Sequence, residues 1–535
     1  MEKVKSETEQ FCHDILNLGV NRSRPLANLV MSLSAQATAQ SVVALSESEL
    51  FHYHYSNLPK ILSDIAWDAP SFLSLNQKIR SLFNPYLPSL RQEEGVKFYG
   101  LTTDVTKILK AHSPTLEGRG YVPIANNVIS SNKAIGVGFR ISMTHLNAFD
   151  KGEAHWCPPL SIQRMGVQDD ALAVGIEQIK SLLADPTFPF GENLVVHKAD
   201  NAYGCAAFLA PLYELDNLVN LVRLRPSSKV YSATFNNQTG GAPQIYGEKW
   251  YLSEQTGNKT YHKKGKPYVV WQQSIMDLKA NDSLEIPMVL KNKRAVILCL
   301  HRWNDIKIRS KNGHNMKDKP LDLVRVTVKD AKTNQKVFDR PLFIAVSGQR
   351  KAEIPTTLVQ TQYRERFDVE GFYRFGKQSM LLDKLQTPDL QHLDNWLLVF
   401  SLAVWLLFTA RNATTLNLKA WEKYLPINKI KEEKVNELGD SVKPVLTLAQ
   451  TRKGAKTLLL TFDKTPFLPQ KYIKAKGRQQ GQTQPKRPRF KIVKKIKKMT
   501  KKEILILKNM NRKKSKNIVS LNKRLVAVRG GVSKV

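Results

Sequence analysis

The sequence predicts a mixed α/β fold, in which a core sheet with flanking helices is interrupted by a β-rich segment. An apolar run that ends in an acid, Asn193–Asp200, has the composition of a buried strand. Short alternating runs separated by turn residues fill the stretch 226–340. Polar residues at helical spacing follow at 363–377, so helix and strand signals share one chain.

The length of 535 residues is typical of three or four domains. We divide the chain by composition and pattern into a helical N-terminal domain (1–90), a first part of the core (91–225), a β-rich insertion (226–340), a second part of the core (341–425) and a basic, largely disordered tail (426–535).

The N-terminal segment has apolar residues at helical spacing in 25–33 and 36–45, which predicts helices. A small helical bundle and a DNA-end-binding domain are both compatible with this pattern. The two readings stay open, because no helix-turn-helix pattern distinguishes them.

The first part of the core has the order strand, strand, strand, helix, strand. The segments that carry this pattern are 96–104, 134–146, 159–165, 169–184 and 193–200. A further strand is expected at 218–224, before the insertion.

Two acids in this region are candidate site residues. Asp200 ends a buried strand, and Asp104 ends the run that starts at Val96. Acids at the carboxyl ends of sheet strands point into the crevice where α/β proteins bind ligands. Asp150, Asp169 and Asp170 are rivals for the place of Asp104, and a cap or turn role is the ordinary alternative for each.

A polar stripe follows the insertion. Its residues have the spacing Y-x2-R-x3-E-x6-K, and on a helix they occupy an arc of about 60°. They are Tyr363, Arg366, Glu370 and Lys377, with Arg374 close to the same arc. A carboxylate can hold a metal ion there, and cations beside it can hold phosphates. The alternative is a surface helix with charge pairs four residues apart.

The run Tyr363–Gln378, which reads YRERFDVEGFYRFGKQ, resembles the C-terminal catalytic signature of bacterial insertion-sequence DDE transposases. Asp200-Asn-Ala-Tyr203 resembles the surroundings of their second catalytic Asp. The resemblance implies a ribonuclease-H-like catalytic core, a β-rich insertion and a DNA-end-binding N-terminal region. It also implies that Tyr363, Arg366 and Lys377 contact DNA, and we add Arg374 from the same stripe.

The resemblance assigns catalysis and metal binding to Asp104, Asp200 and Glu370. Cleavage and joining of phosphodiesters can use two Mg²⁺ ions about 3.5–4 Å apart, which carboxylates hold well. We therefore expect two Mg²⁺ ions, with Mn²⁺ as a substitute. The four cysteines form no C-x2-C pair, which fits a reducing, cytoplasmic location.

The most apolar run, 396–410, has about 15 residues and is shorter than the roughly 20 that span a bilayer. It predicts a buried helix, with a membrane span as the alternative. Charged residues are spread through the first nine positions, so no signal peptide is expected there.

The formal net charge is +36, and residues 451–535 hold 27 Lys and Arg against two acids. The stretch 478–489 has the Gly, Pro and Gln content of a disordered arm. Such a tail binds phosphates without reading sequence. RNA, an acidic protein or an anionic membrane would suit it equally, so the tail alone does not identify a partner.

The resemblance therefore implies a nucleoid-associated bacterial transposase that cleaves and transfers DNA strands, by the cut-and-paste route of related elements. Its expected partners are double-stranded DNA, as element terminal inverted repeats and target, and a second copy of the chain in a synaptic complex. No membrane partner is expected. A catalytically inactive DNA-binding descendant and a two-metal nuclease without strand transfer remain as alternatives.

Overall fold

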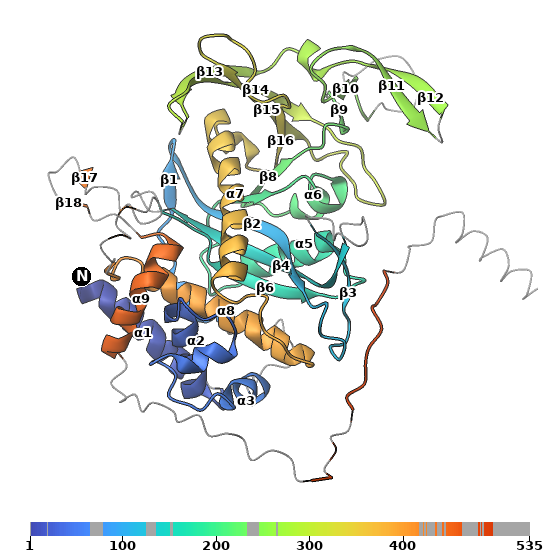
Figure 1. Cartoon of the computed structure of the whole chain (residues 1–535). Helices are drawn as coiled ribbons and strands as arrows, with labels where there is room; N and C mark the ends of the chain where they lie inside the picture. Colours follow the sequence, from blue (N-terminus) through green and yellow to red (C-terminus); the bar gives the residue numbers. More distant parts are fainter. Residues whose placement is uncertain are drawn as a thin grey trace, which may run out of the picture. The chain divides into compact units, whose positions relative to one another are not determined.

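The computed structural model describes residues 2–18, 20–64, 79–124, 135–149, 154–232, 245–263, 266–290, 292–416, 446–462 and 486–495, with residues 421, 424, 434–435, 441–442, 480–481 and 483 (Figure 1). The described helices are α1 (Glu2–Leu16), α2 (Ser23–Ala35), α3 (Asn57–Asp64), α5 (Ala171–Leu183), α6 (Ala206–Leu212), α7 (Thr356–Gln378), α8 (Leu390–Ala410) and α9 (Leu448–Phe462). They surround one large mixed sheet, which confirms the mixed α/β class.

The strands before the insertion are β1 (Arg91–Glu93), β2 (Val96–Leu109), β3 (Gly120–Pro123), β4 (Ile135–Phe149), β5 (His155–Trp156), β6 (Pro159–Met165), β7 (Val195–Ala199) and β8 (Leu218–Arg223). The later strands are β9 (Lys229–Tyr231), β10 (Lys249–Tyr251), β11 (Gly257–Lys263), β12 (Lys266–Gln272), β13 (Asp282–Val289), β14 (Ala295–Ile306), β15 (Leu321–Asp330) and β16 (Leu342–Ser347). The short strands β17 (Lys434–Val435) and β18 (Ser441–Val442) pair with each other.

The centre of the sheet has the order β6-β4-β2-β7-β8. Strand β4 pairs antiparallel with β2 on one side and with β6 on the other, whereas β7 and β8 run parallel to β2. Helix α5 precedes β7, and α6 joins β7 to β8. The predicted order strand, strand, strand, helix, strand is confirmed.

Each face of this sheet has its own helices. Alternate residues of a strand point to opposite faces, and on β7 Val195 and Ala199 pack with α5 and α6 while Val196 packs with α7. Helix α7 crosses β2 and β7 on the second face, where α8 also lies against β6 (Figure 1). Residues with even numbers on β2 and β7 therefore face α7.

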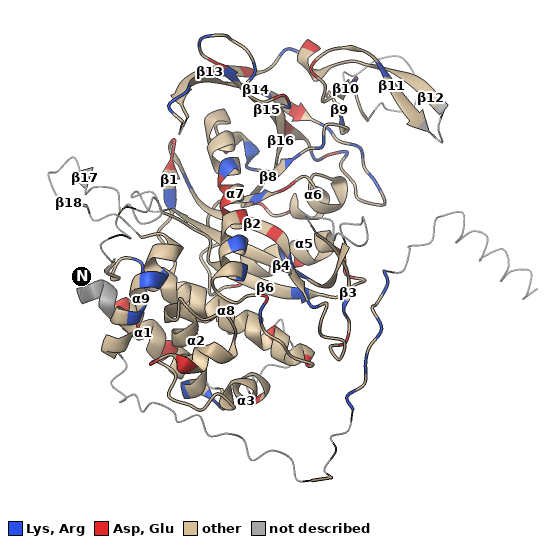
Figure 2. Cartoon of the chain, viewed as in Figure 1, with Lys and Arg blue, Asp and Glu red and all other residues tan. Residues whose placement is uncertain are grey.

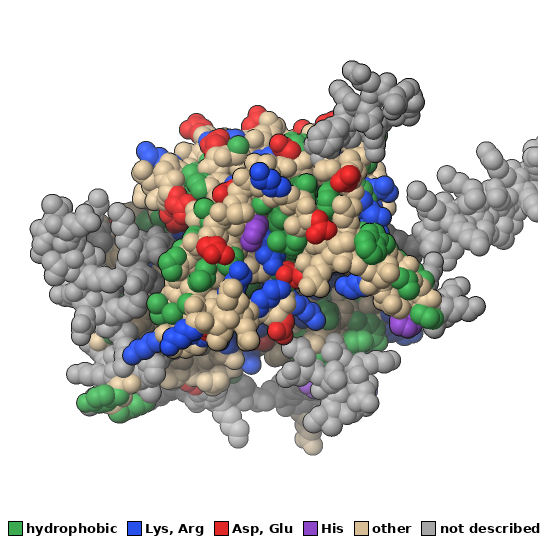
Figure 3. Space-filling model, turned by 90° about the horizontal axis from the view of Figure 1, so that it is seen from above, with side chains coloured by type: hydrophobic (Ala, Val, Ile, Leu, Met, Phe, Trp, Pro, Cys, Tyr) green, Lys and Arg blue, Asp and Glu red, His purple; other side chains and the backbone are tan. Residues whose placement is uncertain are grey.

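The insertion extends the core sheet. Strand β16 pairs antiparallel with β8, and β15, β14 and β13 follow it outward. The β-rich character of 226–340 is confirmed for its described residues, but its last strands share the plane of the core. Acidic and basic side chains are interspersed on this end of the molecule (Figure 3), so its described surface is not uniformly basic.

The core continues into the N-terminal helices. Helices α1, α2 and α3 pack around α8, and their apolar side chains belong to the same buried cluster as those of α8. Helix α8 is long and apolar enough to cross a membrane, but neighbouring elements bury almost all of it. This burial fits the core helix of a soluble protein and agrees with the predicted buried helix.

Part of the predicted tail is folded. Within 426–535, which was predicted to be largely disordered, Leu448–Phe462 form α9 and pack against α2 and α8. Ala455, Leu458 and Leu459 are buried at helical spacing, and their burial offsets the entropy lost on folding. The prediction was wrong for this helix because charge dominates the composition around it.

Helix α8 supplies the first testable prediction. Phe400 is fully buried and stacks edge-on against Phe372 of α7. Phe400→Ala should lower the free energy of unfolding by about 3–5 kcal/mol, because it removes buried area and leaves a cavity. Phe338→Ala, at a 60% exposed position, should change it by less than about 0.5 kcal/mol. Denaturant titration measures both, and equal values would contradict the assigned core.

Candidate active site

The two aspartates occupy matching positions on neighbouring parallel strands. Thr102 of β2 is paired with Lys198 of β7, and Asp104 and Asp200 each lie two residues further along. Both therefore face α7, at a strand separation of about 4.8 Å. Asp200 follows β7 directly, as predicted. Asp104 does not end its strand, because β2 stays paired with β4 as far as Leu109.

Both aspartates are held by backbone N–H groups. Oδ1 of Asp104 accepts a hydrogen bond from Val105 at 2.7 Å, and Oδ1 of Asp200 accepts one from Ala202 at 2.7 Å. The hydroxyl of Tyr373 on α7 donates to the Asp104 carbonyl at 3.0 Å. Tyr373 thus ties α7 to β2 beside the candidate carboxylate, a role that the sequence pattern did not indicate.

The third carboxylate, Glu370, projects from α7. Its side chain is 57% exposed and accepts a hydrogen bond from Arg366 at 2.9 Å. Among the described residues, no three acidic, histidine or cysteine side chains converge closely enough to form a ready-made metal site. Glu370 would have to turn from Arg366 to join the two aspartates.

The pKa of Asp104 links the three carboxylates. Burial raises this pKa to about 6, and the negative charges of Asp200 and Glu370 act in the same direction. The Val105 N–H and the Arg366 guanidinium oppose the shift. Asp104 therefore lies within electrostatic reach of both other acids, which the linear sequence could not establish.

The rivals of Asp104 have ordinary structural roles where they are described. Asp170 caps α5 by accepting a hydrogen bond from Leu172, at 3.2 Å. Asp169 accepts one from Gly166 at 2.7 Å in the preceding turn. Asp150 lies outside the described residues. These positions favour Asp104 as the partner of Asp200.

The remaining stripe residues lie in different surroundings, although charged residues of both signs follow α7 (Figure 2). Tyr363 is 1% exposed, and burial raises its pKa to about 12. Arg366 is also buried, and its Nε has no hydrogen-bond partner within the described structure. Arg374 is exposed, whereas burial lowers the pKa of Lys377, which lies near Asp383 and Lys107.

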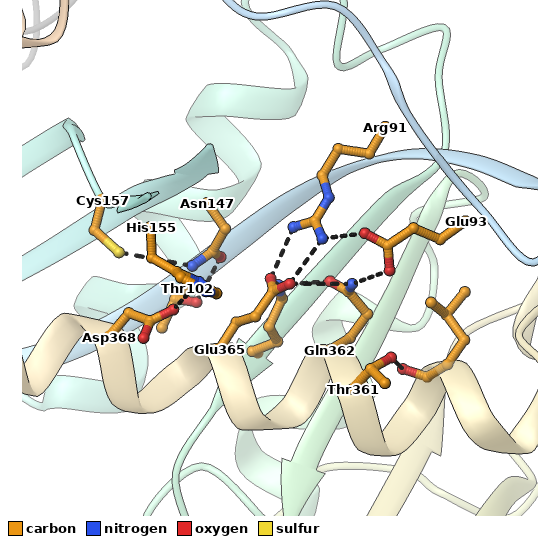
Figure 4. A network of polar contacts seen from close by, with 12 residues as sticks. Arg91, Glu93, Thr102, Asn147, His155, Cys157, Thr361, Gln362, Glu365 and Asp368 are labelled. Atoms are coloured by element: carbon orange, nitrogen blue, oxygen red, sulfur yellow. Dashed lines mark hydrogen bonds and ion pairs between the residues drawn. The ribbon is translucent and has the colours of Figure 1, made fainter. Parts of the chain in front are cut away.

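A buried charge network lies beside this site (Figure 4). Lys198 of β7 has no exposed surface and donates to Glu365 and Gln362 of α7, both at 2.8 Å. Arg91 donates to both oxygens of Glu365, at 2.7 and 2.8 Å, and also contacts Glu93. The network joins the strand before Asp200 to the helix that carries Glu370. The lysine within an apolar strand indicates that a buried charge needs a partner, but the sequence does not show which residue supplies it.

The network holds Glu365 ionised. Burial alone would raise its pKa, but Lys198 and Arg91 outweigh burial and place the pKa at about 2. The depressed pKa means that this ionised carboxylate stabilises the fold above its unfolded pKa of about 4.3. That contribution is lost as the pH falls from about 4 towards 2.

A cavity of about 370 Å³ opens next to Glu370. Its wall includes Phe367, Phe375 and Arg374 of α7, together with His155. Nδ1 of His155 lies 2.8 Å from Oδ2 of Asp368. Thr447, Leu448 and Ala449 complete the wall from the region of α9. Glu370 and Arg374 of the stripe line this cavity, whereas Asp104 and Asp200 do not.

No protein-family model matches the chain, and a search of curated proteins finds no match either.

The ion pair between Lys198 and Glu365 generates the second prediction. Lys198→Met should lower the free energy of unfolding by about 3–5 kcal/mol, because it leaves a buried carboxylate short of one partner. Lys279→Met, at an exposed position, should change it by less than about 0.5 kcal/mol. Chemical denaturation at pH 7 measures both variants. A Lys198→Met protein as stable as wild type would show that the pair does not hold α7 on the sheet.

The raised pKa of Asp104 generates the third prediction. The folded state binds this proton more tightly than the unfolded chain, so the stability that it contributes is lost as the pH rises from about 4 to about 6. Asp104→Asn should therefore be about 1–2 kcal/mol more stable than wild type at pH 7, without metal. Thermal unfolding between pH 4 and pH 8 tests this. A variant with the same pH profile as wild type would contradict the shift.

Proposed function

We propose that the chain is a DDE transposase that cleaves and transfers DNA strands at insertion-sequence ends in a Mg²⁺-dependent reaction. The observation that carries the proposal is the placement of Asp104 and Asp200 at matching positions of parallel strands, under the helix of Glu370. These are the three acids that the resemblance names. Strands β2 and β7 and helix α7 carry these acids, which lie up to 266 residues apart in sequence, and Glu370 joins the two aspartates only if it turns from Arg366.

The strand order supports a ribonuclease-H-like core. Three antiparallel strands, β6, β4 and β2, are followed across the sheet by the parallel strands β7 and β8. Helices α5 and α6 connect the strands on one face, and α7 covers the other. Asp104 lies in β2, which comes first of these strands along the chain, and Asp200 follows β7, which comes fourth. A ribonuclease-H-like fold has its first two acids in this order.

The donor set fits divalent ions. Asp104, Asp200 and Glu370 offer the carboxylate oxygens that Mg²⁺ prefers, and Mn²⁺ accepts the same ligands. Burial is the main cause of the raised pKa of Asp104, and the negative charges of Asp200 and Glu370 add to it. A bound cation would favour the ionised form of this carboxylate. When bound, two Mg²⁺ ions activate an oxygen nucleophile and stabilise the leaving oxygen of a phosphodiester.

The chain's own cations have separate tasks. Arg366 is within charge range of Asp104 and Glu370. Its unpartnered Nε is buried, so it can donate to a DNA phosphate oxygen only after the site rearranges. Arg374 and Lys377 extend the phosphate-binding surface along α7. Tyr363 is buried against the sheet, so its main task is to seat α7, and its hydroxyl reaches DNA only if the helix shifts.

The partners follow from the reaction. Double-stranded DNA supplies both the terminal inverted repeats and the target, and a homodimer holds two ends in one synaptic complex. The excess of Lys and Arg over acids fits a cytoplasmic protein that associates with the nucleoid.

The carboxylates generate the fourth prediction. Asp104→Asn, Asp200→Asn and Glu370→Gln should each reduce Mg²⁺-dependent cleavage by on the order of a thousandfold or more, because each removes a metal ligand. Binding to a duplex without metal should stay within about threefold of wild type. Glu353→Gln, in a surface pair with Arg350, is the matched control and should cleave normally.

The assay uses the DNA that flanks the coding sequence as substrate, and it scores both cut and joined products. Full cleavage by the Glu370→Gln protein would overturn the site. Cutting without joining would identify a two-metal nuclease, and binding without cutting by wild type would identify an inactive DNA-binding descendant.

A further inference from the structure

The basic C-terminal arm includes a short segment that lies against the folded body. Residues 486–492 read Lys-Arg-Pro-Arg-Phe-Lys-Ile and hold four cations and no acid. Phe490 and Ile492 are half-buried, while the residues around them are exposed. Apolar side chains turn inward and cations turn outward, as expected of an extended segment on a surface.

Two hydrogen bonds fix the segment at Phe490. Its N–H donates to the carbonyl of Pro114 at 2.9 Å. Its carbonyl accepts from Nη2 of Arg119 at 3.2 Å. Both partners lie in the loop that joins β2 to β3, so the contact connects residues more than 370 positions apart.

Hydrogen bonds of two buried cations hold this loop in place. Arg119 is 4% exposed, and it also donates to the carbonyls of Leu116 and Lys110, at 3.0 and 3.1 Å. Lys110 donates to the carbonyls of Asp383 and Leu385, at 2.7 and 2.6 Å. The loop is thereby fastened to the connection between α7 and α8, and a buried arginine is oriented to receive the segment.

This anchor lies at the end of the elements that carry the proposed site. Lys110 is six residues beyond Asp104, or roughly 20 Å along an extended strand. One turn of duplex DNA spans about 34 Å. Lys107 and Lys377 lie in the same region, within electrostatic reach of one another. A DNA strand at the carboxylates could therefore also meet the cations of the segment.

We propose that residues 486–492 are a docked cationic strap that holds phosphates of duplex DNA within about one helical turn of the carboxylate site. The inference rests on the proposed function, because it takes the same DNA as ligand. Docking at Phe490 places four charges at a fixed position, which a free arm would not do.

The strap generates the fifth prediction. Changing Lys486, Arg487, Arg489 and Lys491 to Gln should lower affinity for a 30-base-pair duplex. It should also reduce the slope of log K against log salt by about 3 to 4, since each phosphate contact contributes about 0.9. The matched control changes Arg512, Lys513, Lys514 and Lys516 to Gln, which removes the same charge from residues outside the described structure. The control should lower the slope by clearly less than the strap change does.

Phe490→Ala tests the anchor with every charge retained. It should weaken duplex binding by roughly threefold to tenfold, because the cations lose their fixed position. Hydrogen exchange of the Phe490 amide in the full-length wild type should show protection. An unprotected Phe490 amide would overturn the proposed strap. Equal losses of duplex affinity in the strap and control variants would also overturn it.

These measurements use fluorescence anisotropy without divalent metal, so they do not depend on cleavage. Loss of cleavage in the Glu370 variant with no strap effect would leave the proposed function standing and reject the strap. Weaker duplex binding by the strap variant, together with normal cleavage by the Glu370 variant, would support the strap and reject the proposed active site.

Discussion

The buried pair of Lys198 and Glu365 is the interaction on which the geometry of the site depends. A charged lysine inside a sheet is costly unless a partner and hydrogen bonds compensate it. Glu365 and Gln362 accept hydrogen bonds from the lysine, and Arg91 binds Glu365. All of these contacts form together only when α7 lies at one position on β7. Asp200 is two residues beyond the lysine and Glu370 is five residues beyond the glutamate. The pair therefore sets the position of one candidate ligand relative to another.

Arg366 gives the site a second level of organisation. It contacts Glu370 directly and lowers the pKa of Asp104, so one cation neutralises charge that would otherwise accumulate. Tyr373 binds the backbone at Asp104 from the same helix. Two successive turns of α7 thus hold the carboxylates in place by charge and by hydrogen bonding.

Much of the fold was accessible from the sequence. The strands β4, β6, β7 and β8 lie where alternating or continuous apolar runs predicted them. Such runs predict strands because buried positions of a sheet require apolar side chains. Asp200 was found in the same way, since an acid after an apolar run marks the end of a strand. Asp104 was harder, because its strand continues through Val105–Leu109 with alternating burial and no turn signal.

What could not be predicted depends on pairing between distant residues. The contact of Lys198 with Glu365 spans 167 positions, and no local pattern indicates it. The charge of the surrounding tail hid α9, although Ala455, Leu458 and Leu459 are buried in it at helical spacing. The seating of Tyr363 in the core was also missed, because a helical arc shows which residues share a face but not what the face meets.

The pairing of β16 with β8 has a consequence for how the protein avoids self-association. In a sheet that ended at β8, that strand would present free N–H and C=O groups to other chains. Here the row of strands continues to β13, so the edge on this side lies in the insertion. Strand β13 contains Pro287, which has no N–H to donate, and Glu285, which adds charge. The apolar centre of the sheet is thus separated from a neighbouring molecule by a strand poorly suited to extending it.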